Sequence, residues 1–204
     1  MITFVFDVLI QSMIYISLDY YLLPFYASSR HTFRYVLDSI SHGVVSSLSW
    51  RAFLRMLHED TTSNILDFSI SSTNLLELLL SCLLSVCVDA DHFITAKSFS
   101  LEAATNLNAR PFAHSFFFIP VCMLASQFLF RSSRINLLFA SAIFTHQARD
   151  ALRRGFCFSP LSGNSPPLPF FLYLFLLLTW PIVTARLLVF SCPCKTRART
   201  YDLV

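Results

Sequence analysis

Two pairs of an aspartate and a histidine stand four residues apart in this chain. Asp38 and His42 form the first pair, and His146 and Asp150 form the second. Residues at positions i and i+4 of a helix lie on one face, one turn apart. That spacing lets a carboxylate and an imidazole reach the same metal ion, or lets the carboxylate orient the imidazole. Both pairs therefore indicate either a metal site or polar contacts between helices.

The tetrapeptide DADH adds three more residues of these types in one short segment, and a further histidine follows in RPFAHS. Oxygen and imidazole ligands without a thiolate suit zinc, manganese, iron or magnesium better than monovalent copper. A single aspartate or histidine at a membrane boundary is more often a helix cap or an interfacial residue, so the metal-site hypothesis requires these residues to converge. The aspartate and histidine residues that would have to converge are Asp19, Asp38, His42, Asp89, Asp91, His92, His114, His146 and Asp150.

The composition indicates which elements must position these residues. The chain has 204 residues, of which 55% are hydrophobic and only 13% are charged. Soluble domains have about 25% charged residues, so the deficit predicts helices that face lipid. The net charge of +3 is too small to indicate nucleic acid as a partner. The cysteines do not have the spacing of a disulfide framework.

Six apolar segments approach the roughly 20 residues that a membrane-spanning helix needs. They are residues 2–23, 33–57, 66–88, 112–130, 135–152 and 168–190. We therefore predict an all-α polytopic helical bundle with about six spans, formed by residues 1–191 and followed by a short basic tail, 192–204. Pro120 and Pro181 fall inside spans and predict kinks. If the spans alternate in direction, all of the aspartate and histidine residues named above lie toward one side of the membrane.

The predicted location is an integral membrane protein in a lipid bilayer. The first apolar run is too long for a secretory signal and predicts a retained span. Basic residues are divided almost evenly between the two sides, so the orientation stays undecided. Cys192 and Cys194, next to Lys195, favour palmitoylation and contact with anionic lipid, with an unmodified tail as the alternative.

A family resemblance depends on the same residues. The order of SHG at 41–43, DADH at 89–92, RPFAHS at 110–115 and HQARD at 146–150 resembles the YdjM-like family. Members of that family are described as LexA-regulated, membrane-bound, metal-dependent hydrolases. The runs SVCVDADHF, RPFAHS, HQARDALRRG and SPPLPFFLY more closely resemble the eukaryotic transmembrane protein 267 family. The resemblance covers about residues 38–173 and implies a helical membrane fold with a metal site. Carried over position by position, it implies seven metal ligands, which are His42, Asp89, Asp91, His92, His114, His146 and Asp150.

The chain also departs from the bacterial pattern, which is similar to HRGxTHS around the middle histidine. Ala109, Pro111 and Ala113 stand where that pattern has its first His, its Gly and its Thr. Arg153 replaces the Thr that often follows HxxxD. These departures imply that a metal site could persist after hydrolysis is lost.

Three functions remain open at this stage. The first is a metal-dependent hydrolase that acts on a lipid-like or membrane-accessible substrate. The second is a non-enzymatic membrane protein whose carboxylates and imidazoles pair helices, partly through Arg110, Arg149 and Arg153. The third is ion or proton transport, for which only Asp7, Glu77 and Arg51 are available toward the other side. The identity of the metal, the substrate and any protein partner are not decided by the sequence.

Overall fold

The structure, a computed structural model, describes residues 10–18, 31–58 and 72–191. Residues 10–18 are helical. The elements that follow are α3 (His31–His58), α4 (Ser72–Cys87), α5 (Ala90–Ala96), α6 (Leu101–Thr105), the 3-10 turn η2 (Phe112–His114), α7 (Phe118–Phe130), α8 (Ser133–Arg154) and α9 (Phe170–Ser191). These described ranges contain no β-strand, only two isolated bridges at Cys157. The predicted all-α fold is confirmed.

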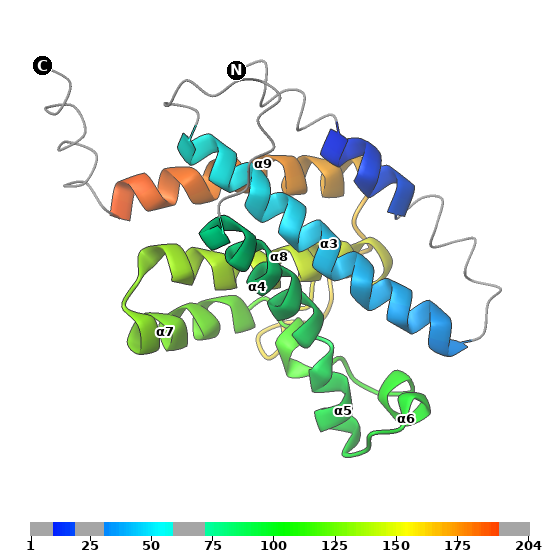
Figure 1. Ribbon diagram of the computed structural model, residues 1–204. Coiled ribbons are helices and arrows are strands. Elements are labelled where there is room, and N and C mark those ends of the chain that lie inside the picture. The colour runs from blue at the N-terminus through cyan, green and yellow to red at the C-terminus, as the bar shows by residue number, and fades with distance from the viewer. Residues whose placement is uncertain (1–9, 19–30, 59–71, 192–204) are drawn as a thin grey trace, which may run out of the picture.

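Helix α8 lies at the centre of the bundle and contacts α3, α4, α7 and α9 (Figure 1). Every residue in 140–149 is buried, so all faces of the helix are enclosed by protein. The helix begins after Ser132, whose hydroxyl accepts a hydrogen bond from the Ile135 amide, and ends at Gly155, which has a φ of 71°. The sequence predicts a lipid-exposed span here, but the neighbouring helices cover this segment instead.

Helices α3 and α4 approach each other closely at Gly43. A Cβ atom at this position would come within 2.6 Å of Cys82 Sγ. One turn further along α3, the hydroxyl groups of Ser46 and Ser81 lie 2.7 Å apart. Small residues and serine hydroxyls allow membrane helices to pack at short distance. This contact holds the part of α3 that carries His42 against the end of α4.

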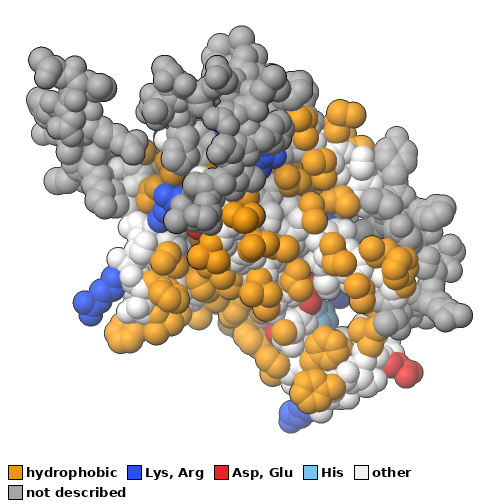
Figure 2. Space-filling model, in the orientation of Figure 1, with side chains coloured by type: hydrophobic (Ala, Val, Ile, Leu, Met, Phe, Trp, Pro, Cys, Tyr) orange, Lys and Arg blue, Asp and Glu red, His pale blue; other side chains and the backbone are white. Residues whose placement is uncertain are grey.

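Two described segments are long and apolar enough to cross a membrane, Asn74–Ala96 and Phe170–Ser191. By contrast, α7 has 13 residues and extends only about 20 Å, which is less than the roughly 30 Å of a hydrocarbon core. Exposed hydrophobic side chains nevertheless cover much of the visible surface (Figure 2). Six crossings therefore stay a prediction, and most of segment 2–23 and the whole tail 192–204 lie outside the described residues.

The two prolines predicted to kink spans have different positions. Pro120 lies in the first turn of α7, where a missing amide proton breaks no helical hydrogen bond. Pro181 lies inside α9, as predicted, and the helix continues on both sides of it.

Candidate metal centre

The predicted aspartate and histidine residues come together at one end of the bundle. The first half of α3 contributes His42, the turn between α4 and α5 contributes Asp89, and η2 contributes His114. The last third of α8 contributes His146 and Asp150. Three overlapping groups of residues could each hold a metal ion, because the ligand atoms within each group lie within 4.8 Å of one another. The groups are His42, Asp89 and His146; Asp89, His92 and His114; and His114, His146 and Asp150.

Three ligand atoms form a compact triangle. The Nε2 atoms of His114 and His146 are 3.2 Å apart, and Asp89 Oδ1 lies 3.5 Å from each of them. Asp150 Oδ2 lies 3.4 Å from His114 Nε2. Any one of these distances alone would suit an ordinary hydrogen bond. The triangle and the Asp150 oxygen beside it come from three separate segments and could hold a cation.

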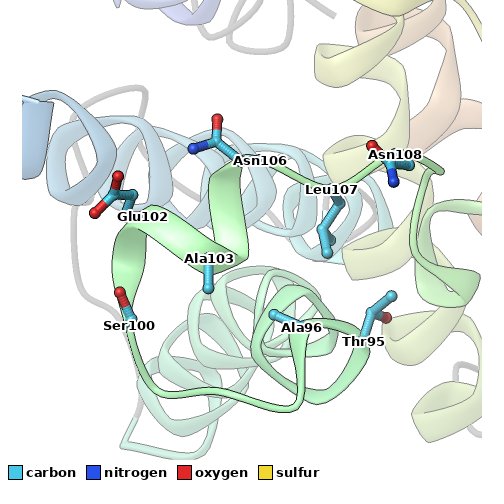
Figure 3. Close-up of a pocket in the computed structure, with 8 residues that line it drawn as sticks. All are labelled: Thr95, Ala96, Ser100, Glu102, Ala103, Asn106, Leu107 and Asn108. Atoms are coloured by element: carbon cyan, nitrogen blue, oxygen red, sulfur yellow. The ribbon is translucent and has the colours of Figure 1, made fainter.

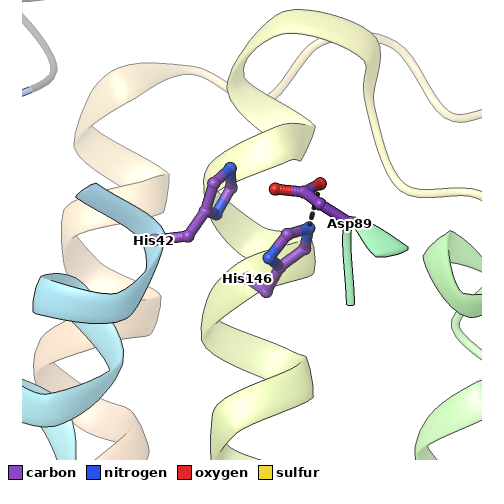
Figure 4. Close-up of side chains that lie close together, drawn as sticks. All are labelled: His42, Asp89 and His146. Atoms are coloured by element: carbon purple, nitrogen blue, oxygen red, sulfur yellow. Dashed lines mark ion pairs between the residues drawn. The ribbon is translucent and has the colours of Figure 1, made fainter. Parts of the chain in front are cut away.

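His42 lies beside this set. Its ring stacks on that of His146, with ring centroids 3.9 Å apart. Its Nε2 atom lies 3.5 Å from Asp150 Oδ1. Figure 4 shows the rings of His42 and His146 side by side, with the Asp89 carboxylate next to them. The i and i+4 spacing of His146 and Asp150 therefore brings both residues to the same centre, as predicted.

Asp91 belongs to none of the three groups and contacts the centre through His114. Its Oδ2 atom accepts a hydrogen bond from the Ala113 amide at 2.8 Å and lies 3.3 Å from His114 Nδ1. Its Oδ1 atom lies 3.1 Å from His92 Nδ1. A carboxylate on Nδ1 fixes the tautomer and leaves the Nε2 lone pair for a ligand. In this structure Nε2 of His114 is the atom that faces Asp89 and Asp150.

Two residues that the sequence did not single out also support the centre. The side-chain amide of Gln147 donates to the carbonyl oxygens of Ala113 and Ser115, which ties η2 to α8. The Ser39 hydroxyl donates to Asp89 Oδ2, which ties α3 to the turn after α4. Gln147 stands inside the HQARD motif, and its polarity within a buried stretch is the signal that could have found it.

Three arginines neutralise part of the acidic charge. Asp38 pairs with Arg149 at 2.7 Å and with Arg153 at 2.8 Å. Asp150 lies 3.3 Å from Arg153 and 3.4 Å from Arg110. The two Asp38 pairs join α3 to α8, as expected if the polar cluster joins helices, whereas Asp150 and Arg153 both belong to α8. Arg153, which replaces a threonine of the bacterial pattern, is thus bound to two carboxylates of the cluster.

The other two carboxylates have no arginine contact within the described part of the chain. Asp89 contacts Ser39 and histidines, and Asp91 contacts histidines and the Ala113 amide. Four carboxylates against three guanidinium groups leave one negative charge when the histidines are neutral. The cluster therefore favours an additional positive charge near Asp89 and Asp91.

The negative charge of the cluster affects the pKa of His114. It lies in η2, outside the two segments with the length and hydropathy of membrane spans. Burial alone would lower the pKa of His114, but the carboxylates of Asp89 and Asp91 raise it to about 9. The proton on His114 and a bound cation would serve the same electrostatic purpose at this place, so the two compete.

A separate ion pair lies away from the cluster. Glu77 of α4 accepts hydrogen bonds from the Trp50 indole at 2.9 Å and from Arg134 at 3.0 Å. These contacts join α3, α4 and α8 and give Glu77 a structural use, as the sequence indicated. A proton path through the membrane would need Glu77 as a relay, but its carboxylate is already paired with a guanidinium group.

A hollow of about 520 Å³ lies between α5 and α6 (Figure 3). Hydroxyl and amide groups contribute much of its lining, including those of Thr95, Ser100, Asn106 and Asn108. None of the seven predicted ligands lines it. This hollow is therefore distinct from the metal-type centre.

Comparison with known proteins identifies the family. The chain is 32% identical over 163 residues to transmembrane protein 267 of Xenopus laevis, a match that covers 76% of this chain and 69% of that protein. It is 30% identical to the protein of the same name from Mus musculus, with 83% and 76% covered. The chain belongs to the transmembrane protein 267 family. No family model and no solved structure matches it.

Membership of the transmembrane protein 267 family makes this an integral membrane protein that resides in a lipid bilayer. In this setting the segment Asn74–Ala96 is a candidate span that includes Asp89, Asp91 and His92 near its end. Ionisable residues within membrane spans are costly and usually mark a functional site.

Proposed function

We propose that this protein is a membrane-embedded hydrolase with a divalent metal ion held by Asp89, His114 and His146. Asp150 is the fourth ligand, or accepts a hydrogen bond from a water on the metal. The proposal is carried by one observation, the close approach of Asp89 Oδ1 and the Nε2 atoms of His114 and His146, with Asp150 Oδ2 beside His114. His42 lies close enough to replace one of these ligands.

The distances favour zinc among the candidate metals. A tetrahedral site with bonds of about 2.0–2.2 Å has ligand atoms about 3.3–3.6 Å apart. Neighbouring ligands of octahedral magnesium, with bonds of about 2.0–2.1 Å, are only about 2.8–3.0 Å apart. Three of the four distances, 3.4, 3.5 and 3.5 Å, lie in the tetrahedral range, and the fourth, 3.2 Å, is just below it and above the octahedral range. Two imidazoles and two carboxylates are also ligands that zinc accepts.

Charge favours one ion over two. The cluster of four carboxylates and three guanidinium groups carries one negative charge. One divalent ion changes this to one positive charge, whereas two ions would leave three positive charges in a partly buried site. Such an excess is unfavourable where the surroundings have a low dielectric constant.

Each residue then has a defined task in hydrolysis. When bound, the metal would lower the pKa of its water and polarise the group to be cleaved. Asp91 holds His114 through Nδ1, so that Nε2 faces the metal position. Arg110 and Arg153 offset the charge of Asp150. The order of the motifs, which resembles that of the YdjM-like hydrolases, supports this assignment, although Ala109, Ala113 and Arg153 depart from their pattern.

Metal analysis of detergent-extracted, full-length protein tests the proposal. We expect about one zinc ion per chain by mass spectrometry, and loss of that ion in Asp89→Ala and His146→Ala. Glu102→Ala is the matched control, because Glu102 is an exposed carboxylate outside the cluster. Substoichiometric metal in the unmodified protein, or full metal retention in both cluster variants, would refute the metal centre.

A structural role is the second candidate, and the arginine pairs are the observation that favours it. Asp38 is held by two arginines, and Asp150 by two, so part of the cluster already joins helices without a metal. In this case Asp89→Ala and Asp150→Ala would lower the unfolding temperature while metal content stays at background. Hydrolysis of a vesicle lipid that depends on Asp89 would argue against it.

A further inference from the structure

The metal-type cluster is closed on most sides and open on one. His42, Asp91, His114 and His146 are buried. The side chains of Asp89 and His92 are 28% and 21% exposed. Figure 2 shows a histidine and an acidic side chain at the surface above the α5–α6 hairpin, bordered by hydrophobic side chains. We call this opening, defined by Asp89 and His92, the mouth of the cluster.

Helix α3 forms one flank of the mouth. The Ser39 hydroxyl binds Asp89 Oδ2, so this part of α3 lies directly beside the opening. Val36 and Ile40 are half-exposed and lie one turn apart on a single face. Ser47, seven residues after Ile40 and therefore on the same face, donates to the Leu78 carbonyl of α4. The face of α3 that carries these apolar residues thus runs along the α4–α5 line.

Helix α5 forms the other flank and continues the lipid-exposed surface of α4. Figure 1 shows α5 following α4 after a short turn. The exposed positions Leu83, Cys87, Ala90 and Ile94 recur every three or four residues across this turn, which keeps them on one face. Ile94 is 66% exposed. His92 stands two residues from both Ala90 and Ile94 and therefore lies on the opposite face of α5. The outer side of α5 thus continues the lipid-facing surface of α4, while its inner side lines the mouth.

The positions of Asp89 and His92 along the span Asn74–Ala96 indicate that the mouth lies within the membrane. Asn74–Ala96 has 23 residues, or about 35 Å of helix, against a hydrocarbon core of about 30 Å. Asp89 and His92 stand seven and four residues before Ala96, which is about 10 and 6 Å from the end of the span. Lys97 follows directly, and a lysine at the end of a span extends its ammonium group to the headgroup level. A water-soluble substrate would have to enter the bilayer to reach this opening.

We propose that the substrate of the metal centre is a membrane lipid, which reaches Asp89 and His92 sideways from the bilayer between α3 and α5. This inference rests on the proposed hydrolase function and specifies its substrate class. The acyl chains remain against the apolar flank of α3 at Val36 and Ile40. The group to be cleaved lies near the glycerol level, just below the headgroups, where the mouth opens.

A paramagnetic probe tests this arrangement without knowledge of the lipid. Full-length protein is loaded with Mn²⁺ and placed in phosphatidylcholine vesicles that contain phosphatidylcholine with a nitroxide at carbon 5 or at carbon 16 of one chain. If the mouth lies near the glycerol level, bound Mn²⁺ should broaden the resonance signal of the nitroxide at carbon 5 more strongly than that of the nitroxide at carbon 16. Ile40→Trp should keep the Mn²⁺ and lose the broadening, because the indole fills the flank. If that variant fails to fold, Val36→Trp gives the same test one turn away on the same flank.

Leu76→Trp is the matched control, since Leu76 is a comparably exposed residue of α4 that stands thirteen positions, or about 20 Å of helix, before Asp89. It should leave the broadening unchanged. Broadening of a water-soluble nitroxide but of neither lipid label would overturn this inference while leaving the metal centre intact. Failure of the unmodified protein to retain Mn²⁺ or Zn²⁺ would refute the metal centre and this inference together.

Discussion

The contact between Asp91 and His114 gives the sharpest prediction about the metal centre. Asp91 Oδ2 binds both the Ala113 amide and His114 Nδ1, while Oδ1 faces His92. Asp91→Asn can keep an oxygen at the Oδ2 position, so it retains the geometry and loses the negative charge. Asp91→Ala loses both. Metal affinity should therefore fall in the order unmodified protein, Asp91→Asn, Asp91→Ala.

The magnitude follows from the position of Asp91 behind a ligand. Loss of a partner that orients a metal-bound histidine typically costs about 10–100-fold in metal affinity. We assign about tenfold, or about 1.4 kcal/mol, to Asp91→Asn, because its hydrogen bonds survive. Asp91→Ala should approach about 100-fold, or about 2.7 kcal/mol, because His114 is then free to rotate and the Ala113 amide has no acceptor.

Zinc affinity can be measured by competition with a chromophoric chelator on detergent-extracted protein, with Glu102→Ala as the control carboxylate. Circular dichroism confirms that each variant keeps its helices. Equal zinc affinity for Asp91→Ala and the unmodified protein would refute the claim that Asp91 positions His114. A loss as complete as that of Asp89→Ala would refute it in another way, since Asp91 would then be a direct ligand.

Three further predictions concern pH and packing. The pKa of His114 is raised to about 9, so a metal ion must displace its proton at neutral pH. Zinc affinity measured by calorimetry should therefore rise about tenfold per pH unit up to about pH 9 and then level off. A zinc affinity that does not change below pH 9 would contradict this prediction. Glu77→Ala should lower the free energy of unfolding in detergent by about 1 kcal/mol through loss of the Arg134 contact, with metal content unchanged; a loss of metal would place Glu77 in the site. Gly43→Val should destabilise the protein by about 1–3 kcal/mol, because α4 is too close to Gly43 to leave room for a side chain. Gly163→Val should not destabilise it, since a side chain at that position meets open space. Equal melting temperatures for the two variants would argue against close packing at Gly43.

The sequence predicted the composition of the cluster better than the surroundings of its helices. Spacing of four residues fixes which residues share a helix face, and this placed His146 and Asp150 together correctly. Alternating spans then predicted that segments far apart in sequence would meet at one end. Both arguments use only local geometry and chain direction, which a single sequence contains.

Contacts between helices were beyond that reasoning. Arg149 binds Asp38 across 111 positions, and no periodicity indicates which of several acids an arginine will meet. The enclosure of α8 was missed for the same reason, because an apolar helix face packs equally well on lipid or on protein. Asp91 was predicted as a ligand like its neighbours, and only the position of His114 Nδ1 separates it from them. Whether Asp91 binds metal directly remains a prediction for the variants above.

The enclosure of α8 has a consequence for how the chain is inserted into the membrane during synthesis. The sequence predicts α8 as a membrane span, and Arg149, Asp150 and Arg153 lie in its last two turns, where charged side chains need protein partners or water. A span of this composition would be poorly stabilised in lipid by itself. It needs the carboxylate of Asp38 from α3, already made, and the apolar cover of α9, which follows the connection 155–169. Membrane integration of α8 should therefore await α9, so that chains truncated before Phe170 would expose α8 to quality control.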